Sequence, residues 1–221
     1  GVIRCSEEIG RRMGLQAEDM ELAKLIALLH DIGRFEQLKR FNSFEADTMD
    51  HATYGVQVLF EEGMIRQFIE EDTWDDVIRT AIAKHSDYEL TGITDERTLL
   101  HARLIRDADK LDNCRVKLED AMETLLDLSA DEVGKYAISP KVREDAFAGK
   151  CICSKDRRTP MDYWVSYVAY FYDLNFRETL DIVAEEQYVK RIIGRVPYTN
   201  EQTKKTMEEL ERQLTEYVRR K

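Results

Sequence analysis

The sequence has little proline and little glycine, and this scarcity limits the folds that it can form. Only three prolines and ten glycines occur in 221 residues. A many-stranded β protein needs turn residues at every hairpin, so this composition disfavours one. Hydrophobic residues make up 43% of the chain and charged residues 35%, which is ordinary for a globular protein. We therefore predict an all-α protein with helices joined by short polar loops.

Long apolar runs and basic runs are also missing. No segment approaches the roughly 20 apolar residues that span a bilayer, and no signal-peptide core is evident. We therefore expect a cytoplasmic protein with no membrane partner. The formal net charge is −11, and no long Lys/Arg run occurs. Because nucleic-acid binders need basic patches that neutralise phosphates, we expect no polymeric nucleic acid as a partner.

Cysteine is too sparse to build a framework. The four cysteines are Cys5, Cys114, Cys151 and Cys153. Their spacing does not suit a disulfide scaffold in a chain of this length. Cys151 and Cys153 form a C-x-C pair, but a zinc knuckle would need a second pair at suitable spacing. We expect four reduced thiols.

Helical periodicity follows along almost the whole chain. In the first half, apolar spacing predicts helices over 5–13, 18–32 and 50–62, and another from about residue 95 onward. A further helix is predicted to open at Thr73 with a start that resembles a capping box. Short breaks at glycines separate these helices, so the sequence predicts a helical core built from consecutive elements.

The second half of the chain differs in character. Pro140 and Pro160 each follow a Ser or Thr, and this pattern predicts two helix starts because proline is favoured at the first helical position. The polar stretch 34–48 is predicted to be an ordered loop or a short helix. We predict a core over 1–128 and a helical extension over 129–221, which packs on that core through a strongly aromatic helix.

Histidine is scarce, and the positions of the few histidines are informative. The whole chain contains His30, His51, His85 and His101. His30 ends a predicted helix and Asp31 follows it directly. A carboxylate at the negative end of a helix dipole is unfavourable unless a cation compensates it. A lone histidine on an apolar face is more often a hydrogen-bonded core residue, but this pair argues for a metal.

The other candidate ligands lie on different predicted helices. His51 begins the helix over 50–62, His85 extends an apolar stripe, and Asp109 lies near the end of the helix that starts at about residue 95. Imidazoles and a carboxylate at the core-facing edges of several helices form the divalent-metal sites of helical proteins. We therefore predict that these three residues join His30 and Asp31 around one cavity.

Two other positions, Asp107 and His101, have to be assigned relative to this predicted site. Asp107 is the alternative to Asp109, because two residues along a helix differ by roughly 200° and only one can face the metal. His101 has no distinguishing neighbours, and we interpret it as a surface histidine or one outside the metal's direct ligands.

The ordered motifs resemble the signature of the HD superfamily of metal-dependent phosphohydrolases. The resemblance covers residues 1–112 and rests on four stretches in the family's order: LLHDIG at 28–33, DHATYG at 50–55, AIAKH at 81–85 and IRDADKL at 105–111. The stretch GRFEQ at 33–37 and the C-terminal extension are also similar to one uncharacterised branch of predicted HD phosphohydrolases. The family's core is all-α.

The resemblance implies a ligand set for one or two divalent cations. It assigns the first cation to His30, Asp31 and Asp109, and makes Asp31 a bridge to a second cation that His51 and His85 hold. Mn, Fe, Mg, Ni, Co and Zn are not distinguished. If only one cation binds, His51 and His85 contact phosphate or act as a general acid instead.

Members of the family normally carry one more ligand histidine on their first helix. Counting back from His30 places that histidine before Gly1. We therefore expect the chain to begin within a truncated first helix, with a metal site that is one ligand short.

The resemblance also implies a reaction. A metal-activated water would cleave the phosphate ester of a small molecule, either a nucleotide or another phosphorylated metabolite. Basic neighbours of the ligands are candidates for binding its phosphate, although each is alternatively a solvated surface side chain. They are Arg34, which follows the His-Asp pair most closely, and Lys84, Arg106 and Lys110.

Two other functions stay open at this point. A catalytically impaired HD module could bind or sense a nucleotide, and an HD-type oxygenase could use a di-iron site with the same ligand types. A homodimer is an open alternative to a monomer.

Overall fold

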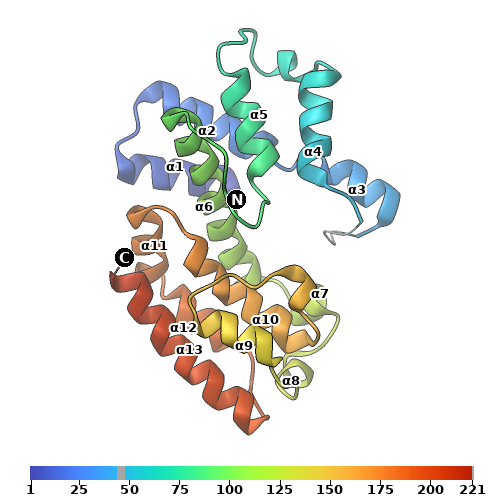
Figure 1. The fold of residues 1–221 in the computed structure, drawn as a ribbon, viewed down its shortest axis with the longest axis vertical. Helices are drawn as coiled ribbons and strands as arrows, with labels where there is room; N and C mark the ends of the chain where they lie inside the picture. The colour runs from blue at the N-terminus through green and yellow to red at the C-terminus, as the bar shows by residue number, and fades with distance from the viewer. Residues whose placement is uncertain (44–47, 221) are drawn as a thin grey trace. The chain divides into compact units, whose positions relative to one another are not determined.

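The fold is all-α. The computed structural model describes residues 1–43 and 48–220, and within these ranges every regular element is a helix and no strand occurs (Figure 1). The predicted fold class is therefore confirmed. None of the helices in these ranges combines the length and the apolar character that a membrane crossing needs.

The chain divides into two compact units. The first is Gly1–Asp109 and the second is Lys110–Lys221. The division falls within the longest helix, α6 (Glu96–Glu119). The functional boundary near residue 128 stays a prediction. All five candidate metal ligands belong to the first unit.

The first unit is assembled from consecutive helices that match most of the predicted ones. They are α1 (Val2–Met13), α2 (Ala17–Leu29), α3 (Arg34–Phe41), α4 (His51–Val56), the π-helical η1 (Gln57–Glu61), the 3-10 helix η2 (Met64–Gln67), α5 (Asp75–Lys84) and the first part of α6. Of the stretch 34–48, the beginning forms a short helix, and residues 44–47 lie outside the described residues. The capping box predicted at Thr73 is wrong, because Trp74 is the N-cap of α5 and makes no side-chain cap hydrogen bond.

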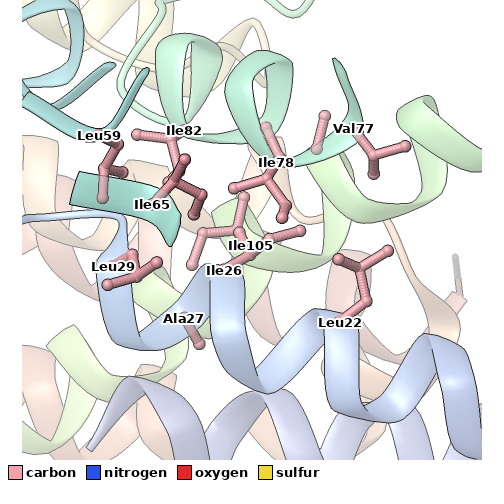
Figure 2. Close-up of a cluster of buried hydrophobic side chains, with 12 residues drawn as sticks. Leu22, Ile26, Ala27, Leu29, Leu59, Ile65, Val77, Ile78, Ile82 and Ile105 are labelled. Atoms are coloured by element: carbon pink, nitrogen blue, oxygen red, sulfur yellow. The ribbon is translucent and has the colours of Figure 1, made fainter. Parts of the chain in front are cut away.

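Aliphatic side chains from α2, η1, η2, α5 and α6 form the core of this unit (Figure 2). Ile26 of α2, Ile78 and Ile82 of α5, and Ile105 of α6 are each at most 2% exposed. Fully burying one such side chain contributes about 1.5–3 kcal/mol. Because Ile26 and Ile82 lie within the last turns of their helices, this packing also fixes the helix ends that carry His30 and His85.

The second unit is a further set of helices. They are the rest of α6, α7 (Met122–Leu126), α8 (Ala130–Val133), α9 (Pro140–Phe147), η3 (Ser154–Asp156), α10 (Pro160–Ala169), η4 (Tyr170–Asp173), α11 (Arg177–Glu185), α12 (Tyr188–Ile193) and α13 (Glu201–Arg220). Both proline-marked starts are confirmed: Ser139 is the N-cap of α9, and Thr159 caps α10 in a full capping box with Asp162. Trp164 of α10 is completely buried within this unit.

Gly33 brings the turn after α2 against the first turn of α4. A Cβ atom at this position would lie 2.0 Å from the carbonyl oxygen of His51 and 2.9 Å from the backbone nitrogen of Gly55. The φ angle of Gly33 is −68°, which any residue adopts. The constraint is therefore a close backbone approach rather than the left-handed conformation expected of a glycine that stops a helix.

We expect Gly33→Ala to destabilise the first unit by about 1–3 kcal/mol, as overpacking does in well-packed interiors. The added methyl group would push the turn away from the backbone of α4, so His51 would also move. The free energy of unfolding in urea, followed by circular dichroism, measures the effect.

Gly55→Ala is the matched control, because its Cβ would meet the Ile32 side chain at 3.3 Å and the Gly33 nitrogen at 3.4 Å. These contacts are tight but not prohibitive, so the loss should be smaller. A Gly33→Ala variant as stable as the wild type would show that this approach does not constrain the turn.

Candidate metal centre

Two of the histidines lie just beyond helix ends, where backbone carbonyls orient their rings. His30 is the C-cap of α2 and His85 is the C-cap of α5. Nδ1 of His30 lies 2.9 Å from the carbonyl oxygen of Ala27, and Nδ1 of His85 lies 2.7 Å from that of Ile82. A carbonyl only accepts, so each Nδ1 carries the proton and donates. In the neutral ring, Nε2 is then left with a lone pair for a metal.

Asp31 lies between the histidines, and its two carboxylate oxygens face different partners. Oδ2 is 3.6 Å from Nε2 of His30. Oδ1 is 3.2 Å from Nε2 of His51 and 3.5 Å from Nε2 of His85. One carboxylate therefore contacts two groups of donors at once, which is the arrangement of a bridging ligand.

His51 enters the cluster from the first turn of α4. Asp50 caps that helix by accepting a hydrogen bond from the backbone nitrogen of Thr53 at 3.0 Å. Nε2 of His51 lies 3.1 Å from Nε2 of His85. With Asp31 Oδ1, these two nitrogens form a triangle of donors with edges of 3.1, 3.2 and 3.5 Å.

Asp109 completes the group from α6. Its Oδ1 lies 3.8 Å from Nε2 of His30. Asp107, the alternative carboxylate, is fully buried. The structure thus brings together His30, Asp31, His51, His85 and Asp109, as the sequence analysis placed them. Whether they can act as metal ligands depends on how well their distances and donor atoms suit a cation.

The donor set fits a divalent cation in both distance and chemistry. Two ligands that each lie about 2.0–2.2 Å from one cation are roughly 3.0–3.5 Å apart at tetrahedral or octahedral angles. The triangle of His51, His85 and Asp31 has these edges. Imidazole nitrogen and carboxylate oxygen suit most first-row divalent metals, so the metal's identity stays open. Among the described residues, the ligand atoms of His30, Asp31 and His85 also lie within 4.8 Å of one another.

A buried nitrogen supports the same conclusion. Nε2 of His30 is buried and has no hydrogen-bond partner, because the carboxylate oxygens of Asp31 and Asp109 lie beyond hydrogen-bond distance at 3.6 and 3.8 Å. A buried polar atom without a partner costs about 1–3 kcal/mol. Coordination to a cation between the histidine and these carboxylates would satisfy this atom.

The exposure of the donors indicates where a substrate would reach them. The three histidines are each 5% exposed, whereas the side chains of Asp31 and Asp109 are 43% and 32% exposed. The imidazoles therefore form the floor of the cluster and the carboxylates its solvent-facing side. An open coordination position facing solvent is what a catalytic metal site requires.

The charges in the cluster favour an ionised carboxylate. Burial opposes ionisation of Asp31, but its contacts with the imidazoles of His51 and His85 and the nearby Arg34 guanidinium outweigh it and hold the carboxyl pKa far below its usual range. For His30, burial lowers the pKa while Asp109 and Asp31 raise it, and the carboxylates prevail. For His51, burial dominates and lowers the pKa.

Two of the predicted phosphate-binding side chains lie near the cluster. Nε of Arg34 is 3.3 Å from Asp31 Oδ1, and the guanidinium also donates to Oε1 of Gln37 at 3.0 Å. Lys84, on the turn before His85, forms a partly exposed ion pair with Asp87 at 3.5 Å. Arg34 therefore contacts a predicted ligand directly, and substrate binding by either side chain stays a prediction.

The other two predicted phosphate-binding residues have different surroundings. Arg106 is 2% exposed and its Nη1 donates to backbone carbonyl oxygens at the end of α5. Lys110 belongs to the second unit and pairs with Asp173, with Nζ and Oδ2 2.8 Å apart. These contacts give both residues structural partners, and neither contact supports a role in substrate binding.

One of the two interpretations of His101 is wrong, and the sequence analysis missed one glutamine. His101 is 1% exposed and its Nε2 donates to Asp19 at 3.0 Å, so the surface interpretation is wrong. Gln37 is completely buried, accepts the hydrogen bond from Arg34 and donates to Oγ1 of Thr48 at 2.9 Å. A glutamine in a short polar helix gives no signal of this role in the sequence.

Comparison with known proteins identifies a family for the first unit. The family model described as HD domain matches residues 1–114, just over half of the 221 residues. The match includes all five donors of the cluster. No curated protein and no solved structure matches the chain.

We expect Asp31→Ala to lower divalent-metal affinity more than any single histidine substitution in the cluster, because Asp31 contacts both groups of donors. Titration with Mn²⁺ or Zn²⁺, followed by calorimetry, measures the loss. His101→Gln is the control outside the cluster, since this buried histidine pairs with Asp19. Equal losses in both variants would mean that Asp31 is not a ligand.

Metal affinity should fall as the pH is lowered, because imidazoles must lose their second proton to bind a cation. His30 should be the first histidine to compete, since its pKa is raised above the ordinary value of about 6.5 and it protonates at higher pH than His51. At a pH below its own pKa, each histidine that must lose a proton to bind the metal lowers the apparent metal affinity by about tenfold per pH unit. Proton release measured in two buffers of different ionisation enthalpy checks this, and an affinity independent of pH between 8 and 5 would contradict it.

Proposed function

Since the chain belongs to the HD-domain family, whose members are generally metal-dependent phosphohydrolases, we propose that it hydrolyses the phosphate ester of a small molecule. The substrate class we favour is a nucleotide or another phosphorylated metabolite. The observation that carries this proposal is the position of Asp31, with one oxygen towards His30 and the other towards His51 and His85.

The geometry favours two overlapping sets of ligands. His30, Asp31 and Asp109 would hold one cation, and Asp31, His51 and His85 would hold another. The second set has the tighter spacing, with all three edges at or below 3.5 Å. Occupancy of both sets is the state that we propose for the active protein.

A divalent cation bound here would supply a water of lowered pKa and positive charge for the phosphoryl oxygens. The protein's own residues supply orientation. Carbonyls at the ends of α2 and α5 fix the rings of His30 and His85, and the partly exposed carboxylates leave one side open for substrate.

Arg34 is the side chain best placed to bind the phosphate. Its side chain is 27% exposed and contacts Asp31, so its guanidinium lies beside the candidate ligands and is accessible to solvent. The hydrogen bond to buried Gln37 restrains the side chain before substrate arrives. A planar guanidinium can donate two parallel hydrogen bonds to a phosphate, which favours Arg34 over Lys84 for this role.

We expect His30→Ala and Asp31→Ala each to abolish metal-dependent phosphatase activity while leaving helical content unchanged, because both side chains lie at the cluster rather than in the aliphatic core. Arg34→Met should raise KM more than it lowers kcat. A panel of phosphorylated metabolites, assayed by phosphate release with Mn²⁺ or Fe²⁺ added, measures these effects. The His101→Gln variant controls for loss of a buried histidine.

Metal binding by the wild type without hydrolysis of any phosphoester in the panel would contradict the enzymatic proposal. It would favour the alternative of a module that senses a nucleotide. Oxygen consumption by iron-loaded protein, in place of phosphate release, would favour the oxygenase alternative.

A further inference from the structure

The end of α5 is held by a buried arginine from another helix. Arg106 lies on α6, and its side chain is shielded from solvent, with 2% of the residue exposed. Its Nη1 lies 3.1 Å from the carbonyl oxygen of Lys84, 3.2 Å from that of His85 and 2.6 Å from that of Asp87. The Lys84 oxygen belongs to the last residue of α5, and the other two belong to the turn that follows it.

The carbonyls of Lys84 and His85 lie at the C-terminal end of α5, and that of Asp87 lies two residues beyond the C-cap. The last four carbonyl groups of an α-helix lack intrahelical donors, and a cation near them is also favoured by the helix dipole. Arg106 supplies a donor and a positive charge at the same point. Burying a guanidinium is costly unless hydrogen bonds compensate, and the three carbonyl oxygens supply acceptors for this one.

The turn that Arg106 fixes carries one of the candidate metal ligands. The backbone of His85 is held by Arg106 through its carbonyl oxygen, and the ring of His85 is held by Ile82 through Nδ1 at 2.7 Å. These two contacts restrain both the backbone and the ring of His85, whose Nε2 faces Asp31 at 3.5 Å. Arg106 is also three residues before Asp109 on the same helix, so α6 anchors His85 and supplies a carboxylate to the same cluster.

We propose that Arg106 is a positioning residue for the metal centre, which acts through His85 and does not bind the substrate. Arg106 therefore has an indirect role in metal binding, in place of the direct role in phosphate binding that the sequence suggested. Any effect of Arg106 on activity rests on the proposed function above. Its effect on the orientation of the His85 ring is independent of that function.

Arg97 offers a matched control on the same helix. It also connects α6 to α5, but at the opposite end of α5: its guanidinium stacks over the ring of Trp74 at 3.9 Å. It forms an ion pair with Asp19 at 2.7 Å. Arg97→Met should therefore loosen the same pair of helices without freeing the turn that contains His85.

The experiment compares the full chain as wild type, Arg106→Met, Arg106→Lys and Arg97→Met. The first readout is the tautomer of His85 in the metal-free protein at about pH 8, from ¹⁵N long-range NMR of the imidazoles. The second is the affinity for Zn²⁺ or Mn²⁺. The third is the free energy of unfolding, which identifies a general loss of stability.

In the wild type, we expect His85 to be protonated on Nδ1 alone. Arg106→Met should give a mixture of tautomers and lower metal affinity by at least about tenfold, as the loss of residues that orient metal ligands does. Arg106→Lys keeps the charge and should retain part of both properties, and it provides a folded variant if Arg106→Met does not fold. Arg97→Met should leave the tautomer and the affinity within twofold of the wild type.

Three results would overturn the proposal. They are an unchanged tautomer and affinity in Arg106→Met, equal losses in Arg106→Met and Arg97→Met, and a Lys variant as impaired as the Met variant. If the wild type binds no metal, the proposed function fails, and the His85 tautomer still decides whether Arg106 positions that ring.

Discussion

The carboxylate of Asp31 lies where a negative charge is unfavourable by itself, just beyond the C-terminal end of α2. Its surroundings compensate for this position. Imidazole nitrogens of His51 and His85 lie within 3.5 Å of one oxygen, and His30 lies 3.6 Å from the other. An imidazole binds a cation through the lone pair of its unprotonated nitrogen, so an ionised Asp31 among these rings makes a donor set suited to a cation.

Much of the first unit serves to bring these groups together. The aliphatic core around Ile26 and Ile82 fixes the ends of α2 and α5, where the two C-cap histidines lie. Gly33 lets the turn after Asp31 approach the backbone of His51. At both helix ends, a carbonyl oxygen of the last turn accepts a hydrogen bond from Nδ1, and this contact orients the ring of a candidate ligand.

The sequence predicted the all-α class and the convergence of the five donors, because helical periodicity and the order of the few histidines and aspartates can both be identified without a structure. It did not predict the surroundings of single side chains. Arg106 and Arg34 are equally basic in the sequence, yet one is buried against carbonyls and the other lies against Asp31. The burial of His101 and Gln37 depends on contacts with Asp19 and Thr48, which lie far from them along the chain. Such partners follow from packing rather than from local pattern.

Anomalous diffraction from crystals of the full chain grown with Mn²⁺ would test the metal centre most directly. The geometry predicts an anomalous peak about 2.0–2.2 Å from Asp31 Oδ1 and from Nε2 of His51 and His85, with a second peak near His30 and Asp109 if both sets are filled. A well-ordered crystal with Mn²⁺ bound elsewhere, and no peak among these five side chains, would contradict the assignment of this cluster as a metal centre.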